Sequence, residues 1–369
     1  QVATWLTRAP ARRVAGQMPL GRKAQMLSSA AERALAPTWR RGGWARVQAQ
    51  IHRPAALRCC AALAGMPKVV IVNASKYDRG CSWSALGKVA QVHRYDDSMR
   101  DEILERAQGA SVIVTKELPV PADLINALPA SVKGICEAGT GYNNIDLEAA
   151  TARGMTVCNV PAYSTKAVAA LVMTYVLNFS CSMFEHKRRY FTGERDSFTT
   201  GMEGGGGTVS YELPHMELDD KIIGLICGGG RIGLAVADMA LAFDMRVLVS
   251  GRSKPKRADL EFVKTEELLE RSDFVSVHCP LFPETKHLID SKMIRKMKSS
   301  AYLINCARGA VVKEVDLIAE LHKGTIAGAA LDVQEQEPLP MDSPLFTTPN
   351  LYLSPHIGWQ RLESRQKLV

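Results

Sequence analysis

Short β-branched apolar runs alternate with helical stretches along most of the chain, and this alternation constrains the fold more than any other feature. Five such runs follow Met66, and six more follow a glycine-rich interval. Because parallel strands need a crossover helix between them, the alternation predicts an α/β protein with two parallel sheets. The predicted strands are 69–73, 89–95, 111–115, 134–138 and 156–160, then 222–227, 246–250, 274–279, 302–307, 326–333 and 351–354, with shorter helices at 96–108 and 146–153.

Two segments interrupt this alternation. Residues 164–190 are predicted to form one long apolar helix, with Ser164 and Thr165 as N-cap residues. A helix this apolar must be covered, either by its own domain or by a second subunit. Residues 191–219 contain a run of glycines at 201–207 and are predicted to be a flexible loop.

Length and composition are those of two folded domains. Of 369 residues, 46% are hydrophobic, enough for two cores of roughly 150 residues each. No apolar run reaches the roughly 18 residues that cross a bilayer, so no membrane partner is expected. Nine cysteines are scattered without a CxxC pair, and the sequence has no HExxH helix. We therefore expect free, buried thiols in a reducing compartment, and neither a disulfide framework nor a metal site.

Positive charge is concentrated at the start of the chain. Residues 1–65 hold ten Arg and one Lys against one acid, so the remainder carries +8 minus +10, or −2. Because this remainder is close to neutral, no nucleic-acid partner is expected. An Arg- and Ala-rich leader with few acids resembles a mitochondrial or plastid transit peptide. Alternatively, residues 1–65 are not part of the working protein, since Met66 directly precedes the first predicted strand, and the location is then cytoplasmic.

A glycine-rich turn follows the first strand of the second series. Gly228, Gly230 and Gly233 form a GxGxxG pattern before an apolar helix predicted at 234–243. In a dinucleotide-binding turn the first glycine allows the chain to turn tightly from strand to helix. The second lets backbone N–H groups approach the pyrophosphate, and the third lets the helix pack closely on the strand. Six strands with this turn predict the Rossmann arrangement and bound NAD or NADP. The alternative is a plain tight turn.

The end of the second strand indicates which dinucleotide binds. NAD-binding folds usually place an acid here for the ribose 2′-OH, whereas this sequence has Gly251, Arg252 and Ser253. Arg252 can pair with a 2′-phosphate through two hydrogen bonds, and Ser253 can donate another. Positive potential is added by Lys254, Lys256 and Arg257. These residues favour NADP over NAD, and the alternative is an ordinary solvated basic loop.

Arg308, Glu337 and His356 each follow the end of a predicted strand. Reduction of a 2-keto acid needs a cation for the carboxylate and ketone oxygen, and an acid to protonate the alkoxide. A carboxylate beside a histidine orients the ring and favours its charged form. Because the carboxyl ends of strands meet at the ligand-binding edge of such sheets, the three side chains are expected to converge. Taken singly, each has an alternative as a surface Arg, a solvated loop Glu or a structural His.

Six stretches resemble the D-isomer-specific 2-hydroxyacid dehydrogenases, in that family's order and over roughly residues 67–367. They are TGYNNIDLEAATARGMTVCNVPAYST, GGGRIG, HCPLFPETKHLI, INCARGAVV, AGAALDVQEQEPLP and LSPHIGW. Within the family they are most similar to glycerate dehydrogenases, also called hydroxypyruvate or glyoxylate reductases. The resemblance implies reduction of hydroxypyruvate or glyoxylate to the D-2-hydroxy acid with NAD(P)H. It also implies that Arg308 binds substrate, that His356 is the acid/base and that Glu337 is its carboxylate partner.

The resemblance implies further site residues. Backbone N–H groups of Thr140 and Gly141 would hold the substrate carboxylate, and Lys116 would face the substrate. Asp332 would lie near the nicotinamide carboxamide. Beyond the glycine turn and residues 251–253, the other implied cofactor-binding residues are Arg231, Ile232, Cys279, Pro280, Thr285, Cys306, Ala307, Arg308, His356 and Gly358.

The resemblance also implies a domain arrangement. Residues 67–162 plus 356–369 would form a discontinuous substrate domain flanking the dinucleotide-binding domain at 163–355, with the reaction in the cleft between them. A homodimer through the helix at 164–190 is implied as well. The chain stops at 358–369, where a helix is predicted to begin. We therefore infer a truncated C-terminus that lacks the family's helix returning to the substrate domain.

Other functions remain open on the sequence. A phosphoglycerate or D-lactate type of dehydrogenase is compatible with the same motifs. A non-enzymatic, dinucleotide-sensing corepressor shares the family's fold, but the complete set of Arg308, Glu337 and His356 favours catalysis. Formate dehydrogenases resemble the motif set but carry Gln where Glu337 stands.

Overall fold

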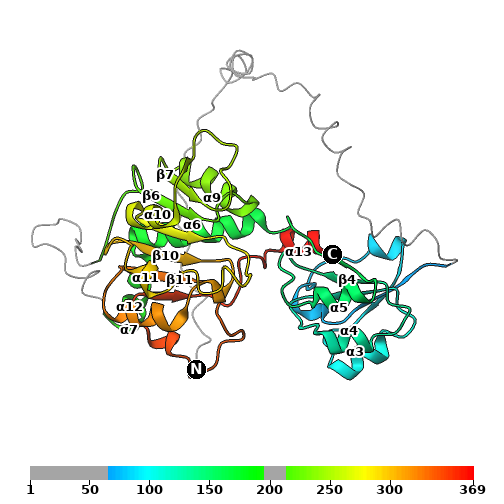
Figure 1. The fold of residues 1–369 in the computed structure, drawn as a ribbon. Coiled ribbons are helices and arrows are strands. Elements are labelled where there is room, and N and C mark those ends of the chain that lie inside the picture. The colour runs from blue at the N-terminus through cyan, green and yellow to red at the C-terminus, as the bar shows by residue number, and fades with distance from the viewer. Residues whose placement is uncertain (1–64, 195–212) are drawn as a thin grey trace, which may run out of the picture. The chain divides into compact units, whose positions relative to one another are not determined.

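A computed structural model describes residues 65–194 and 213–369 of the chain (Figure 1). The predictions made for the Arg-rich leader and for the glycine run at 201–207 fall outside these residues. The described chain is α/β and forms two parallel sheets, so the predicted fold class is confirmed.

The first sheet has five parallel strands in the order β2-β1-β3-β4-β5. The bounds are β1 (Lys68–Ile71), β2 (Gln91–Arg94), β3 (Val112–Thr115), β4 (Gly134–Glu137), β5 (Thr156–Cys158), α3 (Arg100–Arg106), α4 (Ala122–Ala127), α5 (Leu147–Ala152), η3 (Ala74–Lys76) and η4 (Leu86–Lys88). Val70 packs in the core on the side of α3, α4 and α5, whereas Val69 and Ile71 pack in the core on the opposite side. This alternation follows from the two-residue period of a strand that is buried on both faces.

The second sheet has seven parallel strands in the order β12-β11-β10-β9-β6-β7-β8. The bounds are β6 (Ile222–Ile226), β7 (Arg246–Ser250), β8 (Glu261–Phe262), β9 (Phe274–Val277), β10 (Tyr302–Asn305), β11 (Gly328–Leu331) and β12 (Leu351–Leu353). The strand order reverses between β6 and β9, and open α/β sheets bind ligands at such a switch point. The prediction of six strands was wrong by one, because β8 has only two residues, one of them charged, and no apolar run marks it.

Helices cover both faces of this second sheet (Figure 1). The bounds are α6 (Thr165–Cys181) and α9 (Arg231–Leu241) on one face, and α10 (Thr265–Arg271), α11 (Ser291–Ile294) and α12 (Glu314–His322) on the other. Val172 and Val176 of α6 are fully buried in the same core as Val236 of α9. The apolar helix is therefore covered mainly within its own chain.

The prediction of a single helix at 164–190 was wrong. Helix α6 ends at Cys181, and a second helix, α7 (Met183–Thr192), follows it. Ser182 between them has a φ of 51°, a left-handed conformation that cannot continue a helix. Among the described residues no single helix is long and apolar enough to cross a bilayer. Helices α6 and α7 meet the length and hydropathy criteria only when they are counted together, and a bend of 66° separates them. Ser164 occupies the N-cap position, but its side chain accepts no capping hydrogen bond.

The C-terminal residues return to the first sheet. Helix α13 (Leu362–Leu368) carries Arg365, whose Nη1 donates to the carbonyl oxygen of Tyr77 at 3.2 Å. Trp359 is buried in the same core cluster as Ile71. The expectation that no C-terminal helix returns to this part of the chain was therefore wrong: seven helical residues suffice to make these contacts.

Candidate active site

Residues that follow the carboxyl ends of strands in both sheets line one pocket of about 390 Å³. Arg308 follows β10 and His356 follows β12, and both line it, whereas Glu337, the third side chain predicted to converge, is not among the lining residues. The other predicted site residues that line this pocket are Lys116, Thr140, Gly141, Ile232, Cys279, Pro280, Cys306, Ala307, Asp332 and Gly358.

A histidine and a carboxylate are hydrogen-bonded at the edge of this pocket. Nδ1 of His356 lies 2.8 Å from Oε2 of Glu337, and Oε1 of Glu337 accepts a hydrogen bond from the N–H of Gln334 at 2.9 Å. Burial alone would lower the pKa of His356, but the hydrogen bond to Glu337 and the nearby carboxylate charges outweigh burial and raise it. The pair therefore favours a charged imidazole, and Nε2 is the nitrogen left to exchange a proton with a ligand.

Asp332 fastens the loop that carries His356. Its oxygens accept hydrogen bonds from the N–H groups of Ile357 at 2.8 Å and Gly358 at 2.9 Å, and the hydroxyl of Ser354 also donates to it. Burial raises the pKa of Asp332, and these hydrogen bonds offset part of the increase. Asp332 thus lines the pocket, and its carboxylate holds the backbone that follows His356.

Arg308 reaches the turn that follows β4 of the first sheet. Asn305 shapes the turn that carries it, because its Nδ2 donates to the carbonyl oxygen of Arg308 at 2.9 Å and its Oδ1 accepts from the N–H of Ala307 at 3.0 Å. Nε of Arg308 donates to Oδ1 of Asn143 at 3.2 Å. A Cβ added to Gly141 would lie only 1.3 Å from Nη2 of Arg308, so the guanidinium lies against bare backbone.

Backbone donors adjoin this guanidinium. Within residues 65–194 and 213–369, no hydrogen bond is made by the N–H of Thr140 or of Gly141. The segment is held from outside the pocket, because Nδ2 of Asn159 donates to the carbonyl oxygen of Thr140 at 2.7 Å. Two N–H groups and a guanidinium in one pocket form an arrangement suited to a carboxylate.

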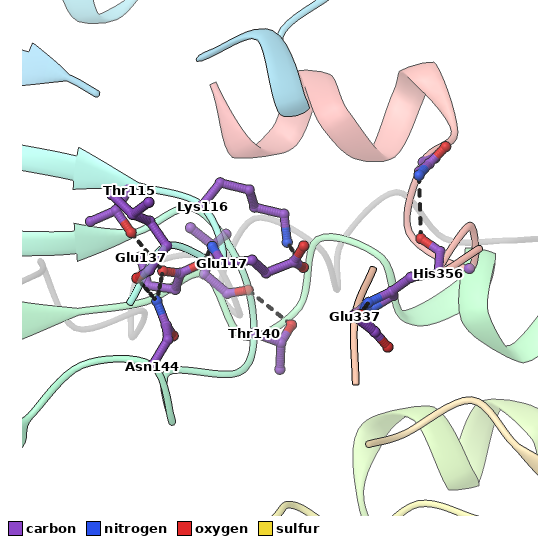
Figure 2. A network of polar contacts seen from close by, with 12 residues as sticks. Thr115, Lys116, Glu117, Glu137, Thr140, Asn144, Glu337 and His356 are labelled. Atoms are coloured by element: carbon purple, nitrogen blue, oxygen red, sulfur yellow. Dashed lines mark hydrogen bonds and ion pairs between the residues drawn. The ribbon is translucent and has the colours of Figure 1, made fainter. Parts of the chain in front are cut away.

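An ionised carboxylate that the sequence analysis did not identify also lines the pocket. Glu117 follows β3 and forms an ion pair with the buried Nζ of Lys116 (Figure 2). This Nζ lies 4.2 Å from the ring centroid of Trp359. Burial alone would raise the pKa of Glu117, but the charges of Lys116, His356 and Arg308 lower it overall. Lys116 therefore lines the pocket with its charge paired to Glu117.

The glycine turn between β6 and α9 fits a dinucleotide. A Cβ on Gly228 would lie 2.4 Å from that of Leu225, and a Cβ on Gly233 would lie 2.3 Å from the carbonyl oxygen of Gly228. Gly230 faces open space and is the N-cap of α9, which begins at Arg231. The first and third glycines therefore permit the close packing, and the second leaves room for a pyrophosphate at the helix N-terminus.

The basic loop after β7 passes beside this turn. A Cβ on Gly229 would lie 3.8 Å from the carbonyl oxygen of Ser253. Arg252 is exposed, and Gly251 has a φ of 157°. The expectation that Arg257 adds positive potential was wrong, because ion pairs with Asp238 and Asp259 offset its charge.

Some residues shape the site without lining the pocket. The predicted cofactor residue Thr285 accepts a hydrogen bond from the N–H of Phe282 at 2.8 Å and donates to the carbonyl oxygen of Pro280 at 2.6 Å, so it fixes the turn after β9. A Cβ on Gly309 would lie 1.9 Å from the backbone of Gln334, so only glycine lets the turn that carries Arg308 cross the loop that carries Glu337.

In the described parts of the chain, no group of three or more His, Cys, Asp or Glu side chains is arranged to hold a metal ion.

Comparisons with known proteins agree with this geometry. Residues 181–358 match the family model of the D-isomer specific 2-hydroxyacid dehydrogenase NAD binding domain. The hydroxypyruvate reductase of Blautia hydrogenotrophica is 32% identical over 309 residues, which cover 82% of this chain and 93% of that protein. The glyoxylate reductase structure from Paecilomyes thermophila has a TM-score of 0.70 and 28% identity, covering 82% of this chain and 92% of that one. The NADPH-dependent glyoxylate/hydroxypyruvate reductase of Sinorhizobium meliloti, solved with NADP and malonate, has a TM-score of 0.69 and 25% identity, covering 82% and 90%.

Fold, glycine turn and pocket define an NAD(P)-dependent oxidoreductase. The chain belongs to the D-isomer specific 2-hydroxyacid dehydrogenase family. The family, the fold class and the NAD(P) cofactor predicted from the sequence are thereby confirmed.

Proposed function

We propose that this chain reduces hydroxypyruvate or glyoxylate to the D-2-hydroxy acid with NAD(P)H. The observation that carries the proposal is that Arg308 and His356 line one pocket, with Glu337 hydrogen-bonded to His356. The same pocket holds Thr140 and Gly141, whose N–H groups make no hydrogen bond within the described residues. The names of two relatives, a hydroxypyruvate reductase and a glyoxylate reductase, support the same substrates.

The polar residues of the site divide the reaction between them in this proposal. Arg308 and the N–H groups of Thr140 and Gly141 bind the substrate carboxylate and orient the ketone. When bound, the nicotinamide supplies the hydride. Nε2 of His356 donates a proton to the ketone oxygen, and Glu337 stabilises the charged ring before the transfer. Asp332 is a positioning residue, because it holds the backbone on the C-terminal side of His356.

A panel of 2-keto acids tests the substrate proposal. We expect rapid loss of NADPH absorbance with hydroxypyruvate and glyoxylate, and slower loss with 3-phosphohydroxypyruvate. The physical reason is that Arg308 is occupied by the substrate carboxylate, while the charge of Lys116 is already paired with Glu117, so neither cation is available to a phosphate. Faster reduction of the phosphorylated acid would reassign the chain to a phosphoglycerate type, and turnover of none of the keto acids would support a dinucleotide-sensing protein.

We propose NADP as the preferred cofactor, with Arg252 as the partner of its 2′-phosphate. Replacing Arg252 with alanine is expected to raise KM for NADPH by about tenfold to a hundredfold, since a hydrogen bond to a charged group contributes about 1.5–3 kcal/mol. KM for NADH should change little, because NADH lacks the phosphate. Steady-state kinetics with both cofactors give the measurement.

The same loop offers a matched control for Arg252. Arg257→Ala removes the same side chain, but the charge of Arg257 is already paired with Asp238 and Asp259. KM for NADPH should therefore stay within about twofold, as for an ordinary surface substitution. An equal rise in KM for NADPH and NADH in Arg252→Ala would remove Arg252 from the phosphate site.

Two further proposals concern the state of the chain in the cell. We propose a homodimer that uses α7, where Met183, Phe184 and Phe191 expose large apolar side chains. Analytical ultracentrifugation that finds only monomers would refute it.

We also propose that residues 1–65 direct the chain to a mitochondrion or plastid. If a fluorescent protein fused to this leader stays in the cytoplasm, the leader does not target an organelle and the cytoplasmic alternative is favoured.

A further inference from the structure

Two cysteines of the second sheet are in contact beside the glycine turn. Sγ of Cys279 lies 2.8 Å from Sγ of Cys227. Cys227 follows β6 and Cys279 follows β9, and these strands pair in parallel with Ile226 opposite Val277. Cys227 lies one residue beyond the end of β6 and Cys279 two residues beyond the end of β9, so the pairing of these strands brings the two side chains together.

The environment of the pair makes one sulfur nucleophilic. The thiol of Cys279 donates a hydrogen bond to Cys227 and, despite some burial, this bond and the charge of Arg252 lower the pKa of Cys227. The same hydrogen bond, together with burial, raises the pKa of Cys279. The thiolate is therefore held on Cys227, which is partly exposed, while Cys279 stays protonated and buried.

The pair also adjoins the cofactor site from two sides. Cys227 directly precedes Gly228, the first glycine of the turn, and has a left-handed φ of 56°. Cys279 lines the pocket next to Pro280. A dinucleotide on this turn and in this pocket would therefore lie against Cys279 and next to Cys227.

We propose that Cys227 and Cys279 are an oxidation site, which low-molecular-weight disulfides convert to an intramolecular disulfide only while the dinucleotide is absent. The shielding by cofactor rests on the cofactor position proposed above, whereas formation of the bond does not. Because the bond ties the residue before the glycine turn to the end of β9, oxidised enzyme loses activity until it is reduced.

The chemistry balances with glutathione disulfide as the oxidant. The thiolate of Cys227 attacks one sulfur of glutathione disulfide, forms a mixed disulfide and releases one glutathione thiolate. Cys279 then passes its proton to the departing glutathione sulfur while its own sulfur, now a thiolate, attacks Sγ of Cys227, so that the protein disulfide forms and the second glutathione leaves as a thiol. Two protein thiols are oxidised, and one small disulfide is reduced to two thiols.

Peptide mapping tests bond formation. After cofactor-free enzyme is incubated with glutathione disulfide, mass spectrometry should find the peptide of Cys227 joined to that of Cys279, and dithiothreitol should separate them and restore turnover. The turnover of Cys227→Ser, whatever its starting value, should not fall during the same treatment. Cys181→Ser makes the same change on α6, where Sγ donates only to the Leu177 carbonyl oxygen, and should behave as wild type. Oxidation that joins other cysteines but not this pair would overturn the proposal.

NADPH in the same reaction tests the shielding. If only free enzyme reacts, NADPH at about 100 times its Kd should slow cross-linking about a hundredfold, in proportion to the free fraction. Fluorescence titration gives this Kd independently. Unchanged cross-linking in enzyme that demonstrably binds NADPH would refute shielding, whereas enzyme that binds no NADPH would count against the proposed function.

Discussion

His356→Ala is expected to lower kcat for keto-acid reduction by about 10²–10⁴, the usual contribution of a positioned general acid. The ring of His356 lines the pocket and carries the proton donor, and no other histidine is hydrogen-bonded to a carboxylate in this pocket in residues 65–194 and 213–369. The Kd for NADPH should change little, because the glycine turn lies on other strand ends. Steady-state turnover and fluorescence titration of NADPH together give both values.

A second His–Glu pair provides the control for this substitution. Nε2 of His287 lies 3.3 Å from Oε2 of Glu335, and neither residue lines the pocket. His287→Ala makes the same chemical change and should leave kcat within about twofold. Wild-type kcat in His356→Ala would exclude this histidine as the proton donor.

The pH profile tests the same assignment through Glu337. Reduction requires a protonated His356, so kcat/KM should fall as pH rises through the raised pKa of this histidine. Glu337→Gln removes one carboxylate charge and weakens the hydrogen bond, both of which raise the pKa of His356, so the pKa should fall although the charges of Glu117 and Asp332 remain. The falling limb should therefore move to lower pH in the variant, and the rising limb of the reverse oxidation should move the same way. Limbs at the same pH in both enzymes would show that Glu337 does not act through His356.

The parts of the site that follow strand ends were predictable from the sequence. Arg308 and His356 come directly after apolar runs, and parallel strands bring their carboxyl ends to one edge. The glycine turn was predictable for a related reason, because close packing of strand and helix leaves no room for a Cβ at Gly233. These signals depend on local sequence and on strand direction alone.

The remaining features depend on packing that no local pattern records. Serine is not a helix breaker, so the bend at Ser182 could not be predicted from its type. Glu117 enters the pocket through a left-handed φ of 54°, which residues other than glycine adopt uncommonly. Asn143 could not be linked to Arg308, because 165 residues separate them and the contact joins two different sheets. The pair of Cys227 and Cys279 was likewise hidden, since only the strand order brings β6 and β9 together.

Arg308→Lys is expected to lower kcat/KM for hydroxypyruvate by about 10²–10³, although the positive charge is kept. A guanidinium presents a planar pair of donors to a carboxylate, whereas an ammonium is a point charge on a flexible stem. The lysine would also lose the hydrogen bond that Nε of Arg308 donates to Asn143. Loss of one donor to developing negative charge has an effect of this size in other active sites. Steady-state kinetics should show the loss in both kcat and KM, because the group orients the ketone as well as binding the carboxylate.

Gly141→Ala should reproduce much of this loss without removing any catalytic group. The added Cβ would lie 1.3 Å from Nη2 of Arg308, so the guanidinium must leave its place beside the N–H groups of Thr140 and Gly141. Gly87→Ala adds the same methyl group where nothing lies within 4 Å, and should leave kinetics unchanged. Wild-type kcat and KM in Gly141→Ala would mean that the guanidinium binds the substrate carboxylate from another position. Gly141 would then not be part of the carboxylate site. If Gly141→Ala has wild-type kinetics and Arg308→Lys has a large loss, the guanidinium is needed for the reaction, but its contact with the first sheet is not.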